Sequence, residues 1–195
     1  MRIVGILLAA GQGSRFGGGK LLAKLADGTP VGVQSVRRLH AALGEVIVVV
    51  KPGDDALVEL LLAEGVRVEV CPDAILGMGE SLAHGVRSTA DADGWIVALA
   101  DMPLIDVATI TRIAEAVRSG ALISAPVYRG QRGHPVGLSG ALGARLKTLT
   151  GDAGARDIVR QEADRVRLID VDDPGVLADI DTPEQLNTFN ANTAT

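Results

Sequence analysis

Short apolar segments rich in branched residues alternate along this chain with segments of helical periodicity, and this alternation restricts the possible folds more than any other feature. The predicted strands are residues 3–9, 46–50, 66–70, 95–100 and 121–127, with a weaker one at 166–171. The predicted helices are residues 31–43, 55–64, 80–89, 107–117, 140–148 and 154–162. Strands that alternate with helices form βαβ units with right-handed crossovers, which build a mostly parallel sheet covered on both faces.

The expected fold is therefore α/β, a single-domain, Rossmann-like three-layer sandwich. The 195 residues suffice for one domain with a substantial core, and no linker or shift in composition divides them. Apolar residues make up 47% of the chain but aromatic ones only 2%, so Val, Ile, Leu and Ala must fill the core, as is usual around buried parallel strands. We place the domain at residues 1–189 and expect residues 190–195 to be a frayed tail.

Composition disfavours several classes of function. No apolar run approaches the roughly 20 residues of a membrane span, and the start lacks the features of a signal peptide, so we expect a cytoplasmic protein without a membrane partner. The net charge of −5 comes from interspersed acidic and basic residues, which disfavours nucleic acid as a partner. Cys71 is the only cysteine, so no internal disulfide or cysteine-based zinc site can form, and its apolar surroundings predict a core residue.

A glycine-rich loop, with glycines at positions 11, 13, 17, 18 and 19, follows the first predicted strand. Glycines allow positive φ and let backbone N–H groups converge on an anion, while Arg15 and Lys20 offer a planar fork and a mobile charge to phosphate oxygens. A surface loop with two solvated cations is the alternative. The spacing excludes two common phosphate motifs: the dinucleotide fingerprint requires glycine where Phe16 stands, and a Walker A loop requires Ser or Thr where Leu21 stands.

Carboxylates also lie at the end of a predicted strand and just before the start of a predicted helix. Asp101 ends the strand at 95–100, and ligands of parallel sheets bind at the carboxyl ends of the strands, so Asp101 is a candidate ligand of Mg²⁺. Its alternative role is to stabilise its own turn. Asp179 and Asp181 precede a helix start marked by Thr182 as N-cap, Pro183 at the first helical position and Gln185 three residues after the cap. Taken alone, the pattern favours the interpretation that these two acids are solvated carboxylates, which the dipole of a helix N-terminus stabilises.

The segment LAAGQGSRFGGGK at residues 8–20 resembles the L-A-[AG]-G-x-x-x-R-x-G-x-x-K signature of nucleotidyltransferases that transfer a nucleoside monophosphate to molybdopterin or to sugar and alcohol phosphates. The residues at signature positions are Leu8, Ala9, Ala10, Gly11, Arg15, Gly17 and Lys20. The A-D-M-P strand end and the I-D-T-P-E element around Asp101 and Asp181 recur in that family. Segments 77–86, 132–140 and 151–159 resemble its molybdopterin branch, so the resemblance spans nearly the whole chain and implies the fold of the nucleotide-diphospho-sugar transferases.

The resemblance divides the candidate site residues among triphosphate, metal and acceptor. It implies that Arg15 and Lys20 contact phosphate oxygens, including those of the departing pyrophosphate, and that Asp101 is catalytic with them. The implied nucleotide-binding residues are Leu8, Ala9, Ala10, Gly11, Arg15, Lys20, Ser81 and Asp101. Asp101 and Asp181 would hold Mg²⁺, with Mn²⁺ and Asp179 as the alternatives. His134 and Arg156 would face the acceptor; a turn histidine, a solvated arginine and, for Ser81, a helix-start residue are the alternatives.

The implied reaction transfers CMP from CTP to the terminal phosphate of molybdenum cofactor and releases pyrophosphate. Such a transfer requires positioning and charge stabilisation rather than a protein nucleophile. Ala10, where guanylyl-transferring relatives more usually carry glycine, favours CTP. The alternatives are a related enzyme using GTP with molybdopterin or another triphosphate with a sugar or alcohol phosphate, an oxidoreductase, and a non-catalytic partner that delivers cofactor to a molybdenum enzyme. A molybdenum enzyme that receives the product is a further candidate partner.

Overall fold

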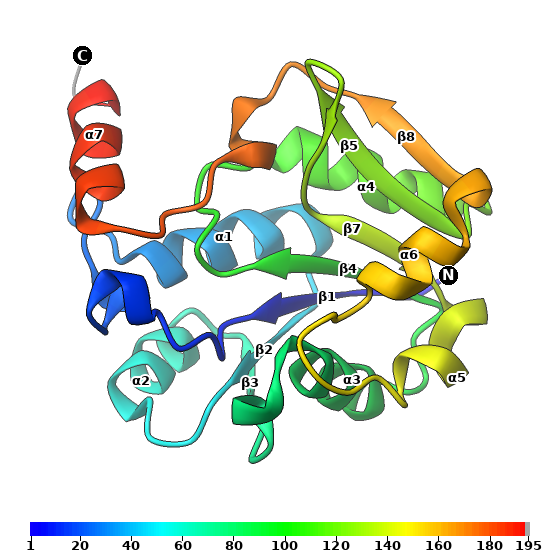
Figure 1. The fold of residues 1–195 in the computed structure, drawn as a ribbon, viewed down its shortest axis with the longest axis horizontal. Helices are drawn as coiled ribbons and strands as arrows, with labels where there is room; N and C mark the ends of the chain where they lie inside the picture. The colour runs from blue at the N-terminus through cyan, green and yellow to red at the C-terminus, as the bar shows by residue number, and fades with distance from the viewer. Residues whose placement is uncertain (194–195) are drawn as a thin grey trace.

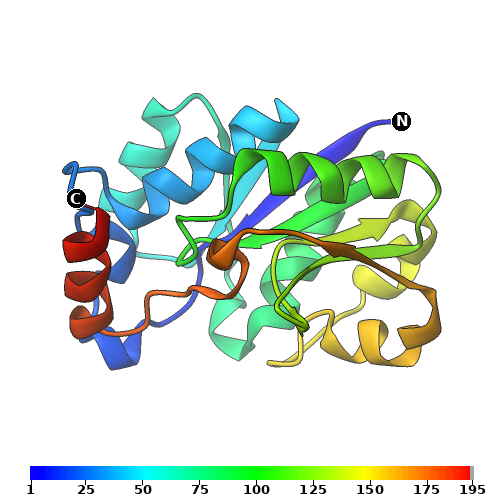
Figure 2. The same cartoon turned by 90° about the horizontal axis from the view of Figure 1, so that it is seen from above.

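The eight strands of the computed structural model, which describes residues 1–193, form one sheet with helices on both of its faces (Figures 1 and 2). The strands are β1 (Ile3–Leu8), β2 (Val46–Val50), β3 (Arg67–Val70), β4 (Gly94–Leu99), β5 (Ile123–Tyr128), β6 (Gln131–Arg132), β7 (Val136–Ser139) and β8 (Val166–Asp170). Their order is β3-β2-β1-β4-β7-β5-β6, and β8 pairs with β5. The parallel pairs are β3 with β2, β2 with β1, β1 with β4, and β5 with β8. This confirms the predicted α/β fold with a mostly parallel sheet.

The helices are α1 (Val31–Leu43), α2 (Asp55–Ala63), α3 (Met78–Ser88), α4 (Val107–Arg118), α5 (Gly143–Leu146), α6 (Arg156–Gln161) and α7 (Pro183–Thr193). Residues of α1, α2 and α4 share one buried cluster with the sheet, and residues of α3, α5 and α6 share the cluster on its other face. Within residues 1–193, no helix combines the length and the apolar character that crossing a membrane requires.

Strand β1 shows how the sequence pattern builds the two layers. Ile3 and Leu7 belong to the cluster with α1 and α4, whereas Val4 and Ile6 belong to the cluster with α3. All residues of the strand are buried. Because side chains alternate across a strand, a strand covered on both faces has no polar position and appears in the sequence as a continuous apolar run.

Strands β6 and β7 are not predicted by the sequence pattern. Strand β7 lies between β4 and β5 and is antiparallel to both. Its four residues are too few for a clear periodicity, and they include Gly137, which approaches Ser124 and Val117 too closely for a side chain. The strand conformation therefore comes from its two neighbours in the sheet. The predicted helix at 140–148 is correspondingly shorter, and consists of a 3₁₀ turn at Gly140–Leu142 followed by α5.

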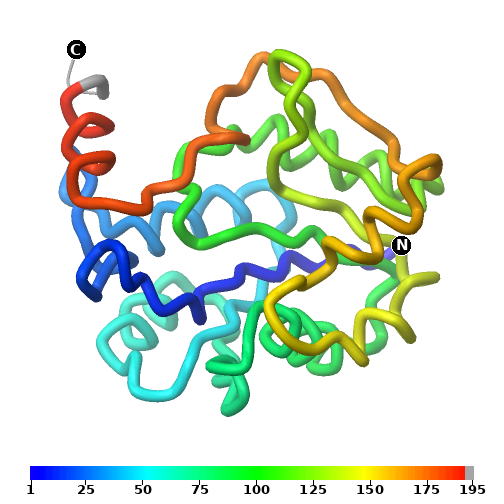
Figure 3. The backbone as a smooth tube through the Cα atoms, in the orientation of Figure 1, coloured from blue at the N-terminus to red at the C-terminus, as the bar shows by residue number. Residues whose placement is uncertain are grey.

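Helix α7 packs against the glycine-rich loop at the end of the molecule opposite the N-terminus (Figure 3). Buried Ile180 and Leu186 contact Val31, and Phe16 and Leu21 pack on this small cluster. The helix extends to Thr193, so it runs past the domain boundary that the sequence predicted after Phe189. Of the predicted frayed tail, residues 194–195 lie outside the described residues.

The start of α3 requires glycine because another backbone segment lies directly against it. The N–H of Gly79 donates to the carbonyl of Gly151 at 2.7 Å, and a Cβ on Gly79 would lie 2.6 Å from the carbonyl oxygen of Thr150. We expect Gly79→Ala to lower the free energy of unfolding by about 1–3 kcal/mol, because backbone cannot yield as a flexible side chain does. Urea denaturation measures this. Gly11→Ala, with no neighbouring atom within 4 Å, is the stability control; equal losses in both variants would contradict the explanation.

Candidate nucleotide-binding site

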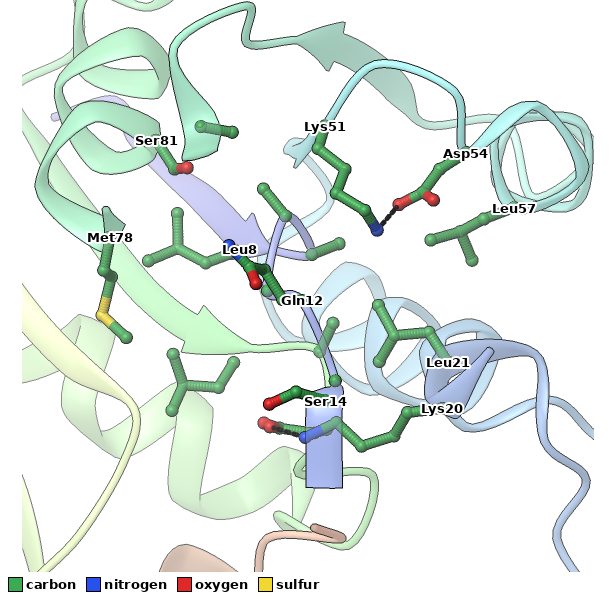
Figure 4. Close-up of a pocket in the computed structure, with 18 of the residues that line it drawn as sticks. Leu8, Gln12, Ser14, Lys20, Leu21, Lys51, Asp54, Leu57, Met78 and Ser81 are labelled. Atoms are coloured by element: carbon green, nitrogen blue, oxygen red, sulfur yellow. Dashed lines mark hydrogen bonds and ion pairs between the residues drawn. The ribbon is translucent and has the colours of Figure 1, made fainter. Parts of the chain in front are cut away.

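A cavity of about 740 Å³ opens at the carboxyl ends of β1, β2 and β4, where ligands of parallel sheets bind (Figure 4). The loop after β1 lines this cavity, as do segments that follow β2 and β3. The residues that the sequence assigned to the nucleotide all line this cavity: Leu8, Ala9, Ala10, Gly11, Arg15, Lys20, Ser81 and Asp101. The topology therefore brings together residues that are up to 93 positions apart only because the parallel strands end at one edge.

The glycine-rich loop is wound into two short 3₁₀ turns, η1 (Ser14–Phe16) and η2 (Lys20–Leu22). Gly13, Gly17, Gly18 and Gly19 all have positive φ, between 57° and 98°, which explains why side chains are absent there. Among residues 1–193, the N–H groups of Gln12 and Gly13 have no hydrogen-bond acceptor, and both residues line the cavity. The loop thus presents free backbone donors to the cavity, as an anion site requires.

Two cations and two carboxylates meet at the edge of the cavity, and we call Arg15, Lys20, Asp101 and Asp181 the charge cluster. Lys20 Nζ donates to Asp101 Oδ2 at 2.7 Å and to Asp181 Oδ1 at 3.0 Å. Arg15 Nη1 donates to Asp181 Oδ2 at 3.0 Å. The Lys20 side chain is only 12% exposed, whereas that of Arg15 is 78% exposed. The cluster therefore has one anchored cation and one that can reorient at little cost.

Asp181 is held in place by the start of α7. The N–H groups of Asp181 and Thr182 both donate to Gln185 Oε1, at 2.7 and 2.8 Å, and the N–H of Gln185 donates to Thr182 Oγ1 at 3.2 Å. This is the predicted capping box. The N–H of Ile180 also donates to the carbonyl of Asp101 at 3.0 Å, which joins the end of β4 to this segment. Both carboxylates consequently reach the same ammonium group.

The charge cluster shifts the pKa values of its members. Burial alone would lower the pKa of Lys20, but the hydrogen bonds to Asp101 and Asp181 raise it above its ordinary value. The hydrogen bond from Lys20 lowers the pKa of Asp181 below its usual range against the opposing effect of burial, and Arg15 adds to this. Lys20 is therefore cationic and Asp181 ionised at neutral pH.

Acid should weaken the fold through Asp181. Because its folded pKa lies below its unfolded value, the stabilisation by its ionised form is complete above the unfolded value of about 3.9 and is lost as pH falls through the lowered folded pKa. We expect Asp181→Asn to lose less stability than the wild type between about pH 6 and about pH 3, as measured by urea denaturation. Asp157→Asn removes an exposed carboxylate paired with Arg160 and should keep the wild-type dependence. A wild-type slope in Asp181→Asn would contradict the prediction.

The two carboxylates of the cluster fit a divalent cation. Asp101 Oδ1 is buried and has no hydrogen-bond partner in the described part of the chain, so one oxygen is unused. The Lys20 ammonium donates hydrogen bonds to both carboxylates, so the two side chains are close enough to share one positive charge. No group of three or more His, Cys, Asp or Glu side chains within residues 1–193 could hold a metal, so further ligands would have to be substrate phosphates and water, as is usual for Mg²⁺. Asp179, the alternative ligand, lines a separate groove beside α7.

The remaining predicted site residues are Ser81, His134 and Arg156, and of these three Ser81 lines the cavity. Ser81 is buried within α3 and its side chain points to the cavity in Figure 4, while Gly77 occupies the N-cap position of that helix. His134 is half-buried between β6 and β7, and its Nδ1 has no hydrogen-bond partner among residues 1–193. Burial lowers its pKa, partly offset by Asp101, so the ring is neutral at pH 7. Arg156 is exposed at the start of α6; neither it nor His134 lines the cavity.

Sequence reasoning missed Lys51 and Asp54, which line the cavity from the segment after β2. A signal was present, because Lys51 directly follows a strand that is parallel to β1, as Asp101 follows β4. Gln12 and Asp152 also line the cavity; Asp152 belongs to the segment that packs against the start of α3.

A glycine-rich loop with free N–H groups beside paired cations and carboxylates, at the carboxyl edge of a parallel sheet, defines a class of α/β proteins suited to phosphorylated nucleotides. The MobA-like NTP transferase domain family matches residues 5–166, and the chain belongs to this family. It is a nucleotidyltransferase that acts on a nucleoside triphosphate.

Three curated relatives are similar along most of their length. The chain is 34% identical to nicotine blue oxidoreductase of Paenarthrobacter nicotinovorans over 94% of each chain. It is 29% identical to purine catabolism protein PucB of Bacillus subtilis, over 94% of this chain and 93% of that protein. It is also 29% identical to molybdenum cofactor guanylyltransferase of Cupriavidus pinatubonensis, over 97% and 96% respectively.

Solved structures share the fold. A homologue, from Mycobacterium sp. strain JC1, of the Mycobacterium tuberculosis protein Rv0371c has a TM-score of 0.87 and 28% identity, and the match covers 99% of this chain and 97% of the other. The manganese complex of Rv0371c from Mycobacterium tuberculosis H37Rv has a TM-score of 0.79 and 26% identity, and the match covers 98% and 99%.

Proposed function

We propose that this protein transfers CMP from CTP to the terminal phosphate of molybdenum cofactor, in a reaction that requires Mg²⁺ or Mn²⁺ and releases pyrophosphate. The observation that carries the proposal is the charge cluster, in which Lys20 bonds both Asp101 and Asp181 beside a loop with free N–H groups. The similarity to a molybdenum cofactor guanylyltransferase supports the acceptor, and Ala10 in the cavity wall supports CTP, since its methyl group leaves less room for a purine.

In this proposal the chain's own residues bind and orient the phosphates. The N–H groups of Gln12 and Gly13 donate to phosphate oxygens, and Lys20 and Arg15 exchange part of their carboxylate contacts for the phosphates that depart. An oxygen of the acceptor phosphate attacks the α-phosphorus in line, a new P–O bond forms, the bond to the bridging oxygen breaks, and pyrophosphate leaves with the electron pair. A divalent cation held by Asp101 and Asp181 would neutralise the charge on the phosphate oxygens.

No residue is required to remove a proton from the nucleophile, because a phosphate acceptor is already ionised near pH 7. This agrees with a site that offers charges and backbone donors rather than a nucleophile with a neighbouring base. On the acceptor side we propose His134, whose neutral ring has an unused Nδ1 near Asp101, and Arg156, whose exposed guanidinium suits an anionic group.

The test is metal-dependent pyrophosphate release from CTP, GTP, ATP and UTP in turn, each with and without molybdenum-loaded molybdopterin. Release from CTP that depends on the cofactor supports the proposal. Cofactor-dependent release from GTP instead would overturn the assignment of CTP. No release with this acceptor would overturn the acceptor, and sugar and alcohol phosphates would then be supplied with the same four nucleotides.

An oxidoreductase is a second candidate, because a relative with 34% identity carries that name. The glycine spacing argues against the usual dinucleotide fingerprint, since Phe16 stands where its third glycine belongs. Calorimetric titration with NADH and NADPH decides between the two: binding of either in the micromolar range, without binding of CTP, would replace the transferase activity proposed here.

A further inference from the structure

A second charged pair lies in the same cavity, apart from the charge cluster. Lys51 directly follows β2 and Asp54 directly precedes α2, and Lys51 Nζ donates to Asp54 Oδ2 at 2.6 Å (Figure 4). Strand β1 lies between β2 and β4 in the sheet. The Lys51–Asp54 pair, which follows β2, and Asp101, which follows β4, therefore stand on opposite sides of the loop that follows β1.

Asp54 is not used by its own helix. It occupies the N-cap position of α2, where an aspartate usually accepts a hydrogen bond from the first turn, yet within residues 1–193 its side chain makes no such bond. Lys51 holds the carboxylate in the cavity wall instead. The two side chains are 36% and 23% exposed, so both are partly desolvated and still accessible to a ligand.

The walls around this pair are mostly apolar. Leu57 of α2 and Leu21 line the cavity and are drawn on the side of the pair in Figure 4, whereas Met78 lies on the other side of the cavity. An apolar enclosure with one donor and one acceptor suits a flat ring with a polar edge. It does not suit a triphosphate, for which the free N–H groups and the charge cluster are better placed.

We propose that Lys51 and Asp54 bind the polar edge of the nucleobase and determine which base is accepted; this rests on the proposed function in that a nucleoside triphosphate occupies the cavity. Lysine only donates hydrogen bonds and ionised aspartate only accepts them. Cytosine presents its amino group beside an acceptor ring nitrogen, so Asp54 accepts from the amino group while Lys51 donates to the nitrogen.

The selectivity for the base would follow from which group faces each residue: the acceptor Asp54 faces the amino group, and the donor Lys51 faces the ring nitrogen. Uracil and guanine carry a carbonyl oxygen where cytosine and adenine carry the amino group, and their neighbouring ring nitrogen is a donor. Either base would oppose Asp54 with an acceptor and Lys51 with a donor. Adenine has the cytosine order, so this pair does not reject it; in this proposal the Ala10 methyl group, which also lines the cavity, leaves less room for its second ring. A site built to bond a polar edge rejects a ligand that leaves its groups unpaired.

The experiment is calorimetric titration of the full chain with CTP, UTP and tripolyphosphate in the presence of Mg²⁺. The wild type is expected to bind CTP more tightly than UTP. Lys51→Met and Asp54→Asn are each expected to weaken CTP about tenfold, and to reduce the CTP-to-UTP ratio, while tripolyphosphate changes less than about twofold. Arg160→Met removes an exposed cation paired with Asp157 outside the cavity, and should change none of these values.

Other results would overturn the inference. Equal weakening of CTP and tripolyphosphate would assign the pair to phosphates, and unchanged binding of both would leave it a structural ion pair. Wild-type protein that binds no nucleotide more tightly than tripolyphosphate would show that no base is bound there. Binding requires neither acceptor nor turnover, so a failure of the proposed reaction is separate: it appears as absent pyrophosphate release with the variant effects on CTP retained.

Discussion

Asp101→Asn is expected to lower metal-dependent pyrophosphate release by about 10²–10³-fold. Asp101 Oδ2 accepts from Lys20 at 2.7 Å, and its buried Oδ1 is unused within the described residues. Asparagine keeps the size of the side chain but removes the charge that would hold a cation, so the loss should fall on turnover rather than on folding. The measurement is single-turnover release at saturating nucleotide, with Mn²⁺ affinity measured separately by electron paramagnetic resonance.

Asp106→Asn is the matched control for this variant. Asp106 is an exposed N-cap residue whose side chain caps no N–H of α4 in the described structure, so the same chemical change there should leave release within about twofold. Full activity of Asp101→Asn, with unaltered Mn²⁺ affinity, would exclude Asp101 from the site and favour a non-catalytic delivery partner.

Lys20→Met is expected to have an effect of similar size on release, about 10²–10³-fold, together with a change in how metal affects stability. Without the ammonium, Asp101 loses its ion pair with Lys20, whereas Asp181 retains its ion pair with Arg15. We expect the metal-free variant to lose about 1–3 kcal/mol of unfolding free energy, and Mg²⁺ to restore part of it, because the cation can then neutralise both carboxylates. Thermal denaturation with and without Mg²⁺ measures this.

Lys24→Met is the control for Lys20. Lys24 is exposed and does not line the cavity, so its loss should alter neither release nor the response to Mg²⁺. If Lys20→Met lowers stability and activity in proportion, and Mg²⁺ restores neither, Lys20 is a structural residue and the proposed contact with the leaving pyrophosphate is wrong.

The elements that local chemistry controls could be predicted from the sequence. The capping box at Thr182 and Gln185 depends on side chains three residues apart, and the structure contains each of its hydrogen bonds. Strand β1 is recognisable because a strand buried on both faces has only apolar positions. The left-handed turns after it depend on glycine at single positions, so the sequence specifies them directly.

Features that depend on the arrangement of distant segments could not be predicted. Strand β7 exists because β4 and β5 supply its hydrogen bonds, and the backbone contact of Gly79 with Gly151 appears only when two loops meet. Lys51 and Asp54 look like ordinary loop charges until β2 is placed beside β1.

By itself, the sequence determined the α/β class, the glycine-rich loop and the residue types available for phosphate and metal, because these follow from periodicity, φ and side-chain chemistry within short segments. Only the tertiary structure decided that Asp181 rather than Asp179 bonds Lys20, and that a second charged pair faces the cavity. The physical reason is that side chains become neighbours through the pairing of parallel strands, whose carboxyl ends meet at one edge whatever their separation along the chain.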